Sequence, residues 1–247
     1  MTATGDRLVD PWFTRTVVSV DPTATRAEVF ALMAERDVSA VPIAKDGHVV
    51  GIVSLTDLLQ RPGPSDEAIT NVMVKDVISI APGTTLGDAG RKMRDKRIHR
   101  VLVIEDGTLA GVLSTREVMR AIAQDRIETP LSAVMSTPVV TVEARDPIGF
   151  TLDLLTRSRV HGVVVTDRGA AVGVFTQLEA LRCQTMPAMA PVEDFMSHSL
   201  LQLPANTPAH RAASFAAATR ARRILAMDGA RVAGIATGID LLELLAD

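Results

Sequence analysis

Four segments of the chain repeat one pattern of a glycine, apolar residues, a hydroxyl residue and a carboxylate. They read GIVSLTDLL from Gly51, GVLSTREVM from Gly111, GVFTQLEAL from Gly173 and GIATGIDLL from Gly234. A Ser or Thr followed three residues later by Asp or Glu is typical of a capping box at a helix start. Such a carboxylate could also accept hydrogen bonds from both hydroxyls of a ribose, each contributing about 1.5–3 kcal/mol. The hydroxyl residue could face a phosphate, because the N–H groups of a helix start favour an anion.

These two interpretations of the pattern compete. A capping box stabilises a helix with no ligand at all, and for a single copy of the motif this interpretation is favoured. The hydroxyl residues are Ser54, Ser114, Thr176 and Thr237, and the carboxylates are Asp57, Glu117, Glu179 and Asp240.

A second group of candidate residues is basic. Six cations lie within ten positions of the second copy, and its segment Arg97-Ile98-His99-Arg100 precedes an apolar strand. We expect Arg91, Lys92, Arg94 and Lys96 to form a solvated helix face, whereas His99 or Arg100 points into a cleft at the strand entrance. Aligned segments in the other copies are Asp37-Val38-Ser39-Ala40, Arg159-Val160-His161-Gly162 and Arg222-Arg223-Ile224, and Arg116 within the second closing motif adds a further cation.

The elements that must position these side chains repeat with them. The four motif glycines recur at intervals of about 60 residues. An apolar pair introduces three of the copies, Val72-Met73, Val134-Met135 and Phe195-Met196, and Pro11-Trp12-Phe13 takes that place in the first. Each copy therefore predicts one structural unit of the same kind.

Within a unit the pattern predicts β-α-β-β-α. In the first copy, the run from Val17 to Val20 predicts a strand, followed by a helix with Ala27, Phe30, Ala31, Met33 and Ala34 on one face. Two apolar runs then flank a turn dipeptide that indicates a β-hairpin, and the fourth hairpin is expected to be shortened. The four dipeptides are Asp46-Gly47, Asp106-Gly107, Arg168-Gly169 and Asp228-Gly229.

The predicted boundaries define four units, unit 1 (8–61), unit 2 (69–122), unit 3 (131–183) and unit 4 (191–247). A unit of this size is small for independent stability, so each should pack against a sister. We expect one pair over 8–122 and another over 131–247. The alanine-rich stretch from Ala212 to Ala221 suits close helix packing between the pairs or between chains.

These repeats resemble the cystathionine β-synthase (CBS) domain family, whose signature is a Val-Met opening, a strand and a closing Gly-apolar-apolar-[Ser/Thr]-x-x-Asp. The resemblance implies an α/β fold of four CBS repeats, paired into two pseudo-twofold Bateman modules. It also implies clefts that bind AMP, ADP, ATP or S-adenosylmethionine. Four repeats in one chain are similar in layout to the gamma subunits of AMP-activated protein kinases, in which two modules form a disc.

The resemblance also implies roles for individual residues. Asp57 and Asp240 match the ribose carboxylates, with Ser54, Thr56 and Thr237 beside them, and their clefts should bind better than the others. Glu117 and Glu179 depart from the family's Asp by one methylene, so with Ser114 and Thr176 they are equally compatible with capping alone. The implied phosphate contacts are His99, Arg100, Arg116, His161 and Arg223.

Composition restricts the remaining possibilities. The net charge of −3 argues against a general nucleic-acid binder, and the single Cys183 excludes an intrachain disulfide framework. The five histidines show no metal-ligand spacing, and neither a signal peptide nor a membrane span is evident, so we expect a cytoplasmic protein without a metal. The usage of Ala, Arg and Val favours a bacterial source.

The sequence-based hypothesis is a regulatory protein that binds an adenosine-type ligand and signals to an unknown partner through a conformational change. It would act as a homodimer or as a disc within one chain. The alternative is a structural or interaction protein that has kept the fold and lost the ligand. An enzyme is not expected, because no nucleophile or general-base constellation is evident.

Overall fold

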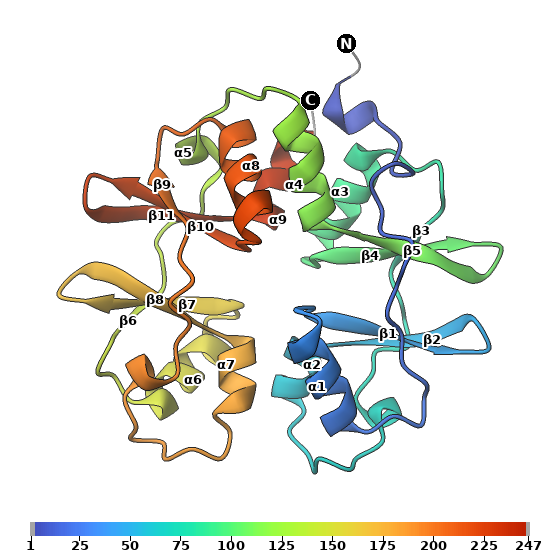
Figure 1. Ribbon diagram of the computed structural model, residues 1–247, viewed down its shortest axis with the longest axis horizontal. Coiled ribbons are helices and arrows are strands. Elements are labelled where there is room, and N and C mark those ends of the chain that lie inside the picture. Colours follow the sequence, from blue (N-terminus) through green and yellow to red (C-terminus); the bar gives the residue numbers. More distant parts are fainter. Residues whose placement is uncertain (1–2, 246–247) are drawn as a thin grey trace.

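The computed structural model describes residues 3–245, so the last two residues of predicted unit 4 lie outside the described residues. Figure 1 shows small sheets, each with its own helices, at the corners of a flat ring. Units 1 and 2 comprise α1 (Arg26–Glu35), β1 (Ala40–Lys45), β2 (His48–Ser54), α2 (Leu55–Gln60), β3 (Ser79–Ile80), α3 (Leu86–Asp95), β4 (Arg100–Glu105), β5 (Thr108–Ser114) and α4 (Thr115–Gln124). Units 3 and 4 comprise α5 (Leu131–Val134), β6 (Thr141–Glu143), α6 (Ile148–Arg157), β7 (Gly162–Asp167), β8 (Ala170–Thr176), α7 (Gln177–Arg182), β9 (Gln202–Pro204), α8 (Ala209–Thr219), β10 (Arg223–Asp228), β11 (Arg231–Thr237) and α9 (Gly238–Leu241). Short 3-10 turns are η1 (Thr4–Asp6), η2 (Ile69–Asn71), η3 (Val192–Asp194) and η4 (Leu242–Leu245).

The sheets follow the predicted order, with one exception. In units 2, 3 and 4 a short first strand pairs in parallel with the first strand of an antiparallel hairpin. The predicted strand from Val17 to Val20 is wrong, because only Val20 forms a bridge, to Ile43. This bridge lies directly before a turn in which Ala24 N–H donates to the Asp21 carbonyl, and residues 17–19 form no rung ahead of it.

The hairpin turns obey their dipeptides in units 1, 2 and 3. Asp46 and Gly47, for example, both have positive φ, at 51° and 81°, as a type I′ turn requires. In unit 4 the pairing of Asp228 with Arg231 places the turn at Gly229 and Ala230. The expectation of a shortened fourth hairpin is therefore wrong, since β10 and β11 contain 6 and 7 residues like their counterparts in unit 1.

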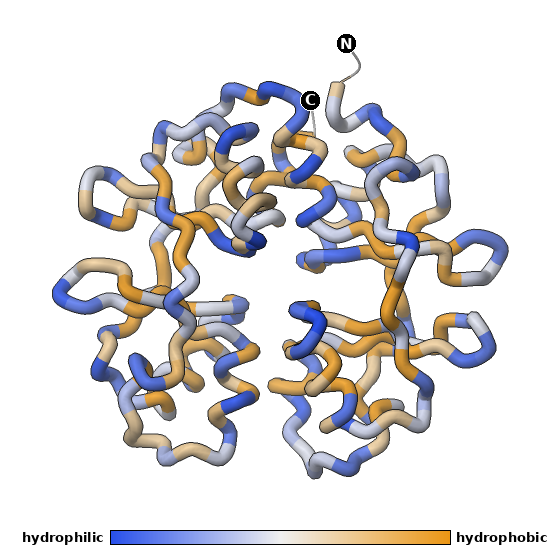
Figure 2. The backbone as a smooth tube through the Cα atoms, viewed as in Figure 1, coloured by the Kyte–Doolittle hydropathy of each residue, from blue (hydrophilic) through white to orange (hydrophobic). Residues whose placement is uncertain are grey.

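Units 1 and 3 each have a small apolar core, whereas units 2 and 4 share one continuous core. Figure 2 shows hydrophobic colours along the strands. In α1 the buried side is formed by Val29 and Met33 together with Arg26, so the predicted face is partly wrong: Ala27 and Ala31 are exposed. The guanidinium of Arg26 donates to the carbonyl of Leu58 and pairs with Glu67, which explains how a charged residue occupies a core-facing position.

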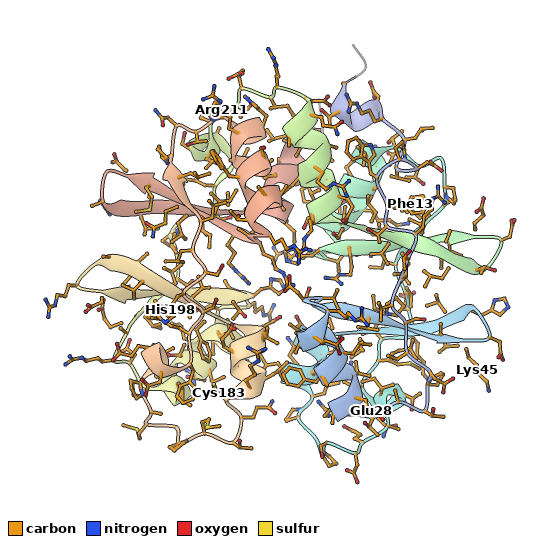
Figure 3. All side chains as sticks on the ribbon, viewed as in Figure 1. Phe13, Glu28, Lys45, Cys183, His198 and Arg211 are labelled. Atoms are coloured by element: carbon orange, nitrogen blue, oxygen red, sulfur yellow. The ribbon has the colours of Figure 1, made fainter. Side chains whose placement is uncertain are left out.

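The repeated glycines are explained by contacts between units. A Cβ on Gly111 would lie 2.3 Å from Cδ2 of Phe13, and one on Gly51 would lie 2.6 Å from Sδ of Met73. The segment that introduces unit 1 thus packs on the sheet of unit 2, and the segment that introduces unit 2 packs on the sheet of unit 1. We call each of these introducing segments a strap, and Figure 3 shows Phe13 on the strap of unit 1, beside β5. Units 1 and 2 are thus held together by exchange, because each packs its introducing segment on the sheet of the other.

The same exchange joins units 3 and 4. A Cβ on Gly173 would lie 2.4 Å from Sδ of Met196, and one on Gly234 would lie 2.4 Å from Sδ of Met135. Sheets do not join across the units: β2 lies beside β5, and β8 beside β11, without pairing. The four motif glycines are therefore required by the close packing of two units within each module.

Helices join the two pairs within the one chain. Helix α4 of unit 2 packs against α8 and α9 of unit 4, and α2 of unit 1 packs against α7 of unit 3. Residues Ala209, Ala212, Ala213 and Ala216 of α8 are buried in one continuous core with α4. Small side chains allow this close approach of the helices, so the alanine-rich stretch packs between the pairs as expected.

Candidate functional site

The entrances of four strands carry the predicted site residues to the middle of the ring. Strands β1, β4, β7 and β10 begin at Ala40, Arg100, Gly162 and Arg223, and each of these residues is paired across its hairpin with the Ser or Thr of the closing motif. The residues just before the strands are Ser39, His99, His161 and Arg222. The hairpin register thus joins the basic group to the hydroxyl-carboxylate motif.

The backbone before each entrance is left-handed in all four units. The φ angles of Asp37, Arg97, Arg159 and Arg220 lie between 49° and 57°. Each of these residues follows the end of a helix, where a left-handed residue is a common cap. Val38 N–H donates to the Met33 carbonyl and Ile98 N–H to the Met93 carbonyl, so the helix ends fix where the strand entrances begin.

The closing motifs all form capping boxes. In unit 1, Asp57 Oδ2 accepts hydrogen bonds from the backbone N–H and the hydroxyl of Ser54, at 2.8 and 2.5 Å. The same arrangement occurs for Ser114 with Glu117, for Thr176 with Glu179 and for Thr237 with Asp240. Capping therefore uses one carboxylate oxygen in each unit and leaves the second for other partners.

The second oxygens differ between units. In unit 4, Asp240 Oδ1 accepts a hydrogen bond of 2.6 Å from the hydroxyl of Ser136, which belongs to the strap of unit 3. Within residues 3–245, no donor is placed on Oδ1 of Asp57. Glu117 and Glu179 are each only 8% exposed. Among the two predicted ribose carboxylates, Asp57 has the free oxygen.

Arg100 and Arg223 cross from one unit to its sister. The guanidinium of Arg100 donates to the Ala40 carbonyl at 2.9 Å and to the Ser39 hydroxyl at 2.6 Å, and that of Arg223 donates to the His161 carbonyl at 2.6 Å. Both are partly buried residues of the strand entrances, and neither forms an ion pair within the described part of the chain. Burial, followed by repulsion from Arg222, lowers the pKa of each to about 10.

His99 and His161 meet across the ring, from unit 2 to unit 3. Nε2 of His99 lies 3.4 Å from Nδ1 of His161, and the rings form a T-shaped pair with centroids 4.7 Å apart. Burial, with the neighbouring His161 and Arg100, lowers the pKa of His99 to about 3, and burial also lowers the pKa of His161. The pair is therefore neutral at pH 7.

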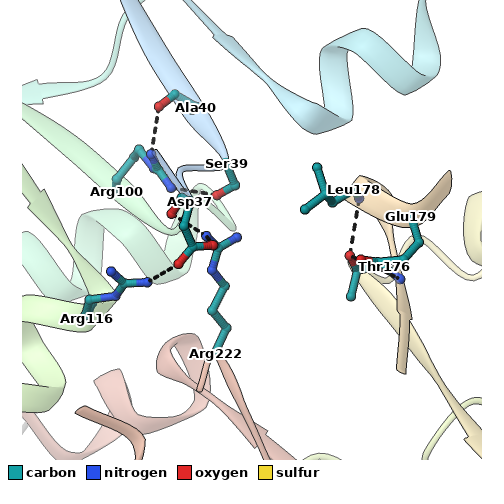
Figure 4. Close-up of polar contacts among 9 residues, drawn as sticks. All are labelled: Asp37, Ser39, Ala40, Arg100, Arg116, Thr176, Leu178, Glu179 and Arg222. Carbon is teal, nitrogen blue, oxygen red and sulfur yellow. Dashed lines mark hydrogen bonds and ion pairs between the residues drawn. The ribbon is translucent and has the colours of Figure 1, made fainter. Parts of the chain in front are cut away.

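The opposite diagonal, between units 1 and 4, is an ion-pair cluster that the sequence analysis missed. Figure 4 shows the Asp37 carboxylate between Arg116 of unit 2 and Arg222 of unit 4. Its Oδ1 is 2.6 Å from Arg222 and its Oδ2 is 3.3 Å from Arg116. One feature of the aligned repeats indicates that Arg222 faces the centre: it occupies the position of His99 and His161.

The predicted residues divide into two groups in space. Figure 3 shows side-chain nitrogens gathered where the four units meet. This meeting point includes the five predicted phosphate contacts, His99, Arg100, Arg116, His161 and Arg223, together with Asp37, Ser39 and Arg222. Thr56 is engaged elsewhere: its hydroxyl donates to Gln177 at 3.1 Å and joins α2 to α7. We call the eight residues at the meeting point, without Thr56, the central cluster.

Other side chains that could do chemistry have structural surroundings. Cys183 is buried, and burial raises the pKa of its thiol, as fits a packed side chain. Arg91 pairs with Asp88, and Lys92 caps the Ser79 carbonyl, both on an exposed face of α3. Residues 3–245 contain no group of three or more potential metal-ligating side chains and no helix long and apolar enough to cross a membrane.

Comparison with known proteins agrees with this arrangement. The family model for the CBS domain matches residues 9–62, 69–124 and 131–184. The chain belongs to the CBS domain family. Unit 4 has the same order of helices and strands, although the family model does not match it separately. The pairing of units 1 with 2 and 3 with 4 is that of CBS repeats in Bateman modules.

Solved structures share the whole architecture. Protein MJ1225 from Methanocaldococcus jannaschii, proposed as an archaeal homologue of γ-AMPK, superimposes with a TM-score of 0.84 at 16% identity, covering 96% of this chain and 99% of that one. An uncharacterized conserved protein from Pyrococcus horikoshii gives a TM-score of 0.71 at 21% identity, covering 97% and 100%. At these identities the likeness establishes the fold.

A curated relative is an uncharacterized 33.4 kDa protein from the ribosomal RNA operon of Thermofilum pendens. It is 25% identical over 188 residues, which cover 70% of this chain and 62% of the relative. Matches to three proteins of Methanocaldococcus jannaschii span 36–49% of their lengths. The chain thus matches less than two thirds of each of these relatives.

Proposed function

We propose that this CBS protein is a regulatory sensor that binds an adenosine-containing, phosphorylated ligand with its phosphate in the central cluster. The observation that carries the proposal is the pair of partly buried guanidiniums, Arg100 and Arg223, that form no ion pair within residues 3–245. An anion that enters there gains charge-assisted hydrogen bonds and neutralises two positive charges that are partly removed from water.

The nucleoside end would be held by unit 1. Asp57 is fixed by its capping box through Oδ2, and this fixes the direction of Oδ1. A carboxylate held in this way can accept a ribose hydroxyl without losing side-chain entropy on binding. Arg100 reaches from unit 2 to Ser39 and Ala40 beside this motif, so it is the phosphate partner we assign to the same cleft.

Regulation would follow from the position of the cluster. Its residues come from all four units, and the two modules contact each other there through His99 with His161 and through Asp37 with Arg222. A ligand that binds the arginines in one arrangement of the modules better than in another must shift the population towards that arrangement. A partner protein would read the shift.

Isothermal titration calorimetry with AMP, ATP and S-adenosylmethionine tests this function. We expect Asp57→Ala to weaken nucleotide binding about ten- to a hundred-fold, as the loss of charge-assisted bonds implies. Arg100→Ala should weaken AMP and ATP more than adenosine, and Lys45→Ala, an exposed cation at the hairpin tip of unit 1, is the matched control. Unchanged nucleotide affinity in both site variants would refute the assignment.

One observation favours the alternative, a CBS protein that acts through protein contacts alone. The second oxygen of Asp240 is already occupied by Ser136, so the motif of unit 4 is complete without a ligand. Thermal unfolding decides between the two functions, since a ligand that binds only the folded state raises Tm. A Tm that no adenosine ligand raises would favour the interaction protein.

A further inference from the structure

Asp37 holds a position that belongs to a cation in the other three units. Arg97, Arg159 and Arg220 occupy the equivalent left-handed residue before their strands. In unit 1 the acidic side chain points into the ring, and its carboxylate pairs with Arg116 and Arg222. The central cluster therefore contains one carboxylate of its own that contacts two of its guanidiniums.

The ion pairs of the Asp37 carboxylate are solvent-exposed and weak. The side chains of Asp37, Arg116 and Arg222 are 52%, 39% and 37% exposed, so solvent and solutes reach all three. Ion pairs this exposed contribute little to folding and exchange easily for other anions. Arg222 also donates to the Asp37 backbone carbonyl at 2.6 Å, a contact that survives loss of the charge.

We propose that Asp37 is an internal competitor for the ligand's phosphates and sets how many phosphates the site selects. This inference rests on the proposed function. Without a ligand, the Asp37 carboxylate pairs with the guanidiniums of Arg116 and Arg222. Once a phosphate has bound there, the carboxylate repels each further negative charge of the ligand. Asp37 thereby favours a monophosphate over a triphosphate.

The size of the effect follows from Coulomb's law. At about 6 Å in a water-like dielectric, removing one repulsive charge raises affinity about threefold for each negative charge on the ligand nearby. Counting about one negative charge near Asp37 for a monophosphate and about two for a triphosphate, we expect Asp37→Asn to tighten binding of AMP about threefold and that of ATP about tenfold.

The test compares the full chain with Asp37→Asn and with Asp46→Asn as the matched control. Asn tolerates the left-handed backbone, and Asp46 is an exposed aspartate of the same unit with a φ of 51°, at the hairpin tip. Calorimetry with AMP, ATP and sodium tripolyphosphate gives the affinities, and thermal unfolding without ligand gives the stability. We expect Asp37→Asn to gain affinity for tripolyphosphate about tenfold and to have the same or a slightly lower Tm.

The outcomes separate this proposal from the proposed function. If Asp37 were only a tether between units 1 and 4, the variant would lose Tm without gaining affinity, and the proposal would be overturned. Unchanged tripolyphosphate affinity, with AMP and ATP still bound, overturns the competitor role and leaves the sensor intact. Tighter tripolyphosphate binding without any nucleotide binding supports the competitor and overturns the adenosine ligand. Loss of binding in Asp37→Asn alone overturns the competitor role and leaves the sensor intact, whereas no binding of any probe by either protein overturns both.

Discussion

Gly111→Ala is the substitution that most sharply tests the exchange between units 1 and 2. The new Cβ would lie 2.3 Å from Cδ2 of Phe13 and 2.7 Å from the carbonyl oxygen of Thr14. Alanine in an extended strand otherwise stabilises by about 0.4–1 kcal/mol, because it restricts the unfolded chain. Overpacking opposes this by about 1–3 kcal/mol, and the backbone oxygen cannot rotate away. We expect a net loss of about 1–2 kcal/mol of unfolding free energy.

Urea denaturation and thermal unfolding measure this loss. For a chain of this length, each kcal/mol lowers Tm by about 2–4 °C. Gly51→Ala is the matched comparison, since the closest atom there is the flexible Sδ of Met73 at 2.6 Å, and it should cost less. Phe13→Leu placed in the Gly111→Ala background should recover part of the loss. A Gly111→Ala protein as stable as the wild type would refute the exchanged contact.

Three further predictions concern individual polar side chains. Arg26→Met should lower the unfolding free energy by about 2–4 kcal/mol in urea, because it leaves Glu67 unpaired; an unchanged midpoint would contradict this role. Because the pKa of His99 is lowered to about 3, the native state resists a proton that the unfolded state takes up, so stability falls as the pH drops from about 6.5 towards 3. His99→Gln should flatten this fall, which is at most about 1.4 kcal/mol per pH unit, and an identical slope in both proteins would count against the neutral pair. Ser136→Ala frees Oδ1 of Asp240, so nucleotide affinity at unit 4 should rise in calorimetry; no change would show that this oxygen does not limit binding.

Local chemistry explains what the sequence could predict. The capping boxes depend on residues three positions apart, such as Ser54 and Asp57, and a hairpin dipeptide such as Asp46-Gly47 depends on its own φ angles. These features form wherever their residues stand together, because the interaction lies within one turn of chain. The sequence therefore predicts the hairpins and the helix starts of all four units. The one difference is the turn of unit 4, which lies at Gly229 and Ala230, one residue later than predicted.

Long-range contacts explain what the sequence could not predict. The partner of Arg222 is Asp37, 185 positions away, and no local pattern indicates that an acidic residue will face a basic one across the ring. The predicted helix face omits Arg26, because its guanidinium reaches the carbonyl of Leu58 in another helix, a contact that no local pattern indicates. The motif glycine was detected as a repeat, yet its cause, the side chain of Phe13 or Met73, belongs to a different unit.

The central claim is that the ligand's phosphate enters where the four units meet. Hydrogen-deuterium exchange on the full chain, with and without saturating AMP, tests it most directly. The account predicts protection of the backbone amides at the strand entrances, 37–40, 97–100, 159–162 and 220–223, and at the Ser54 motif. Protection confined to the outer surface around Ser79 and Lys92 of unit 2, or no change at the entrances at saturation, would contradict it.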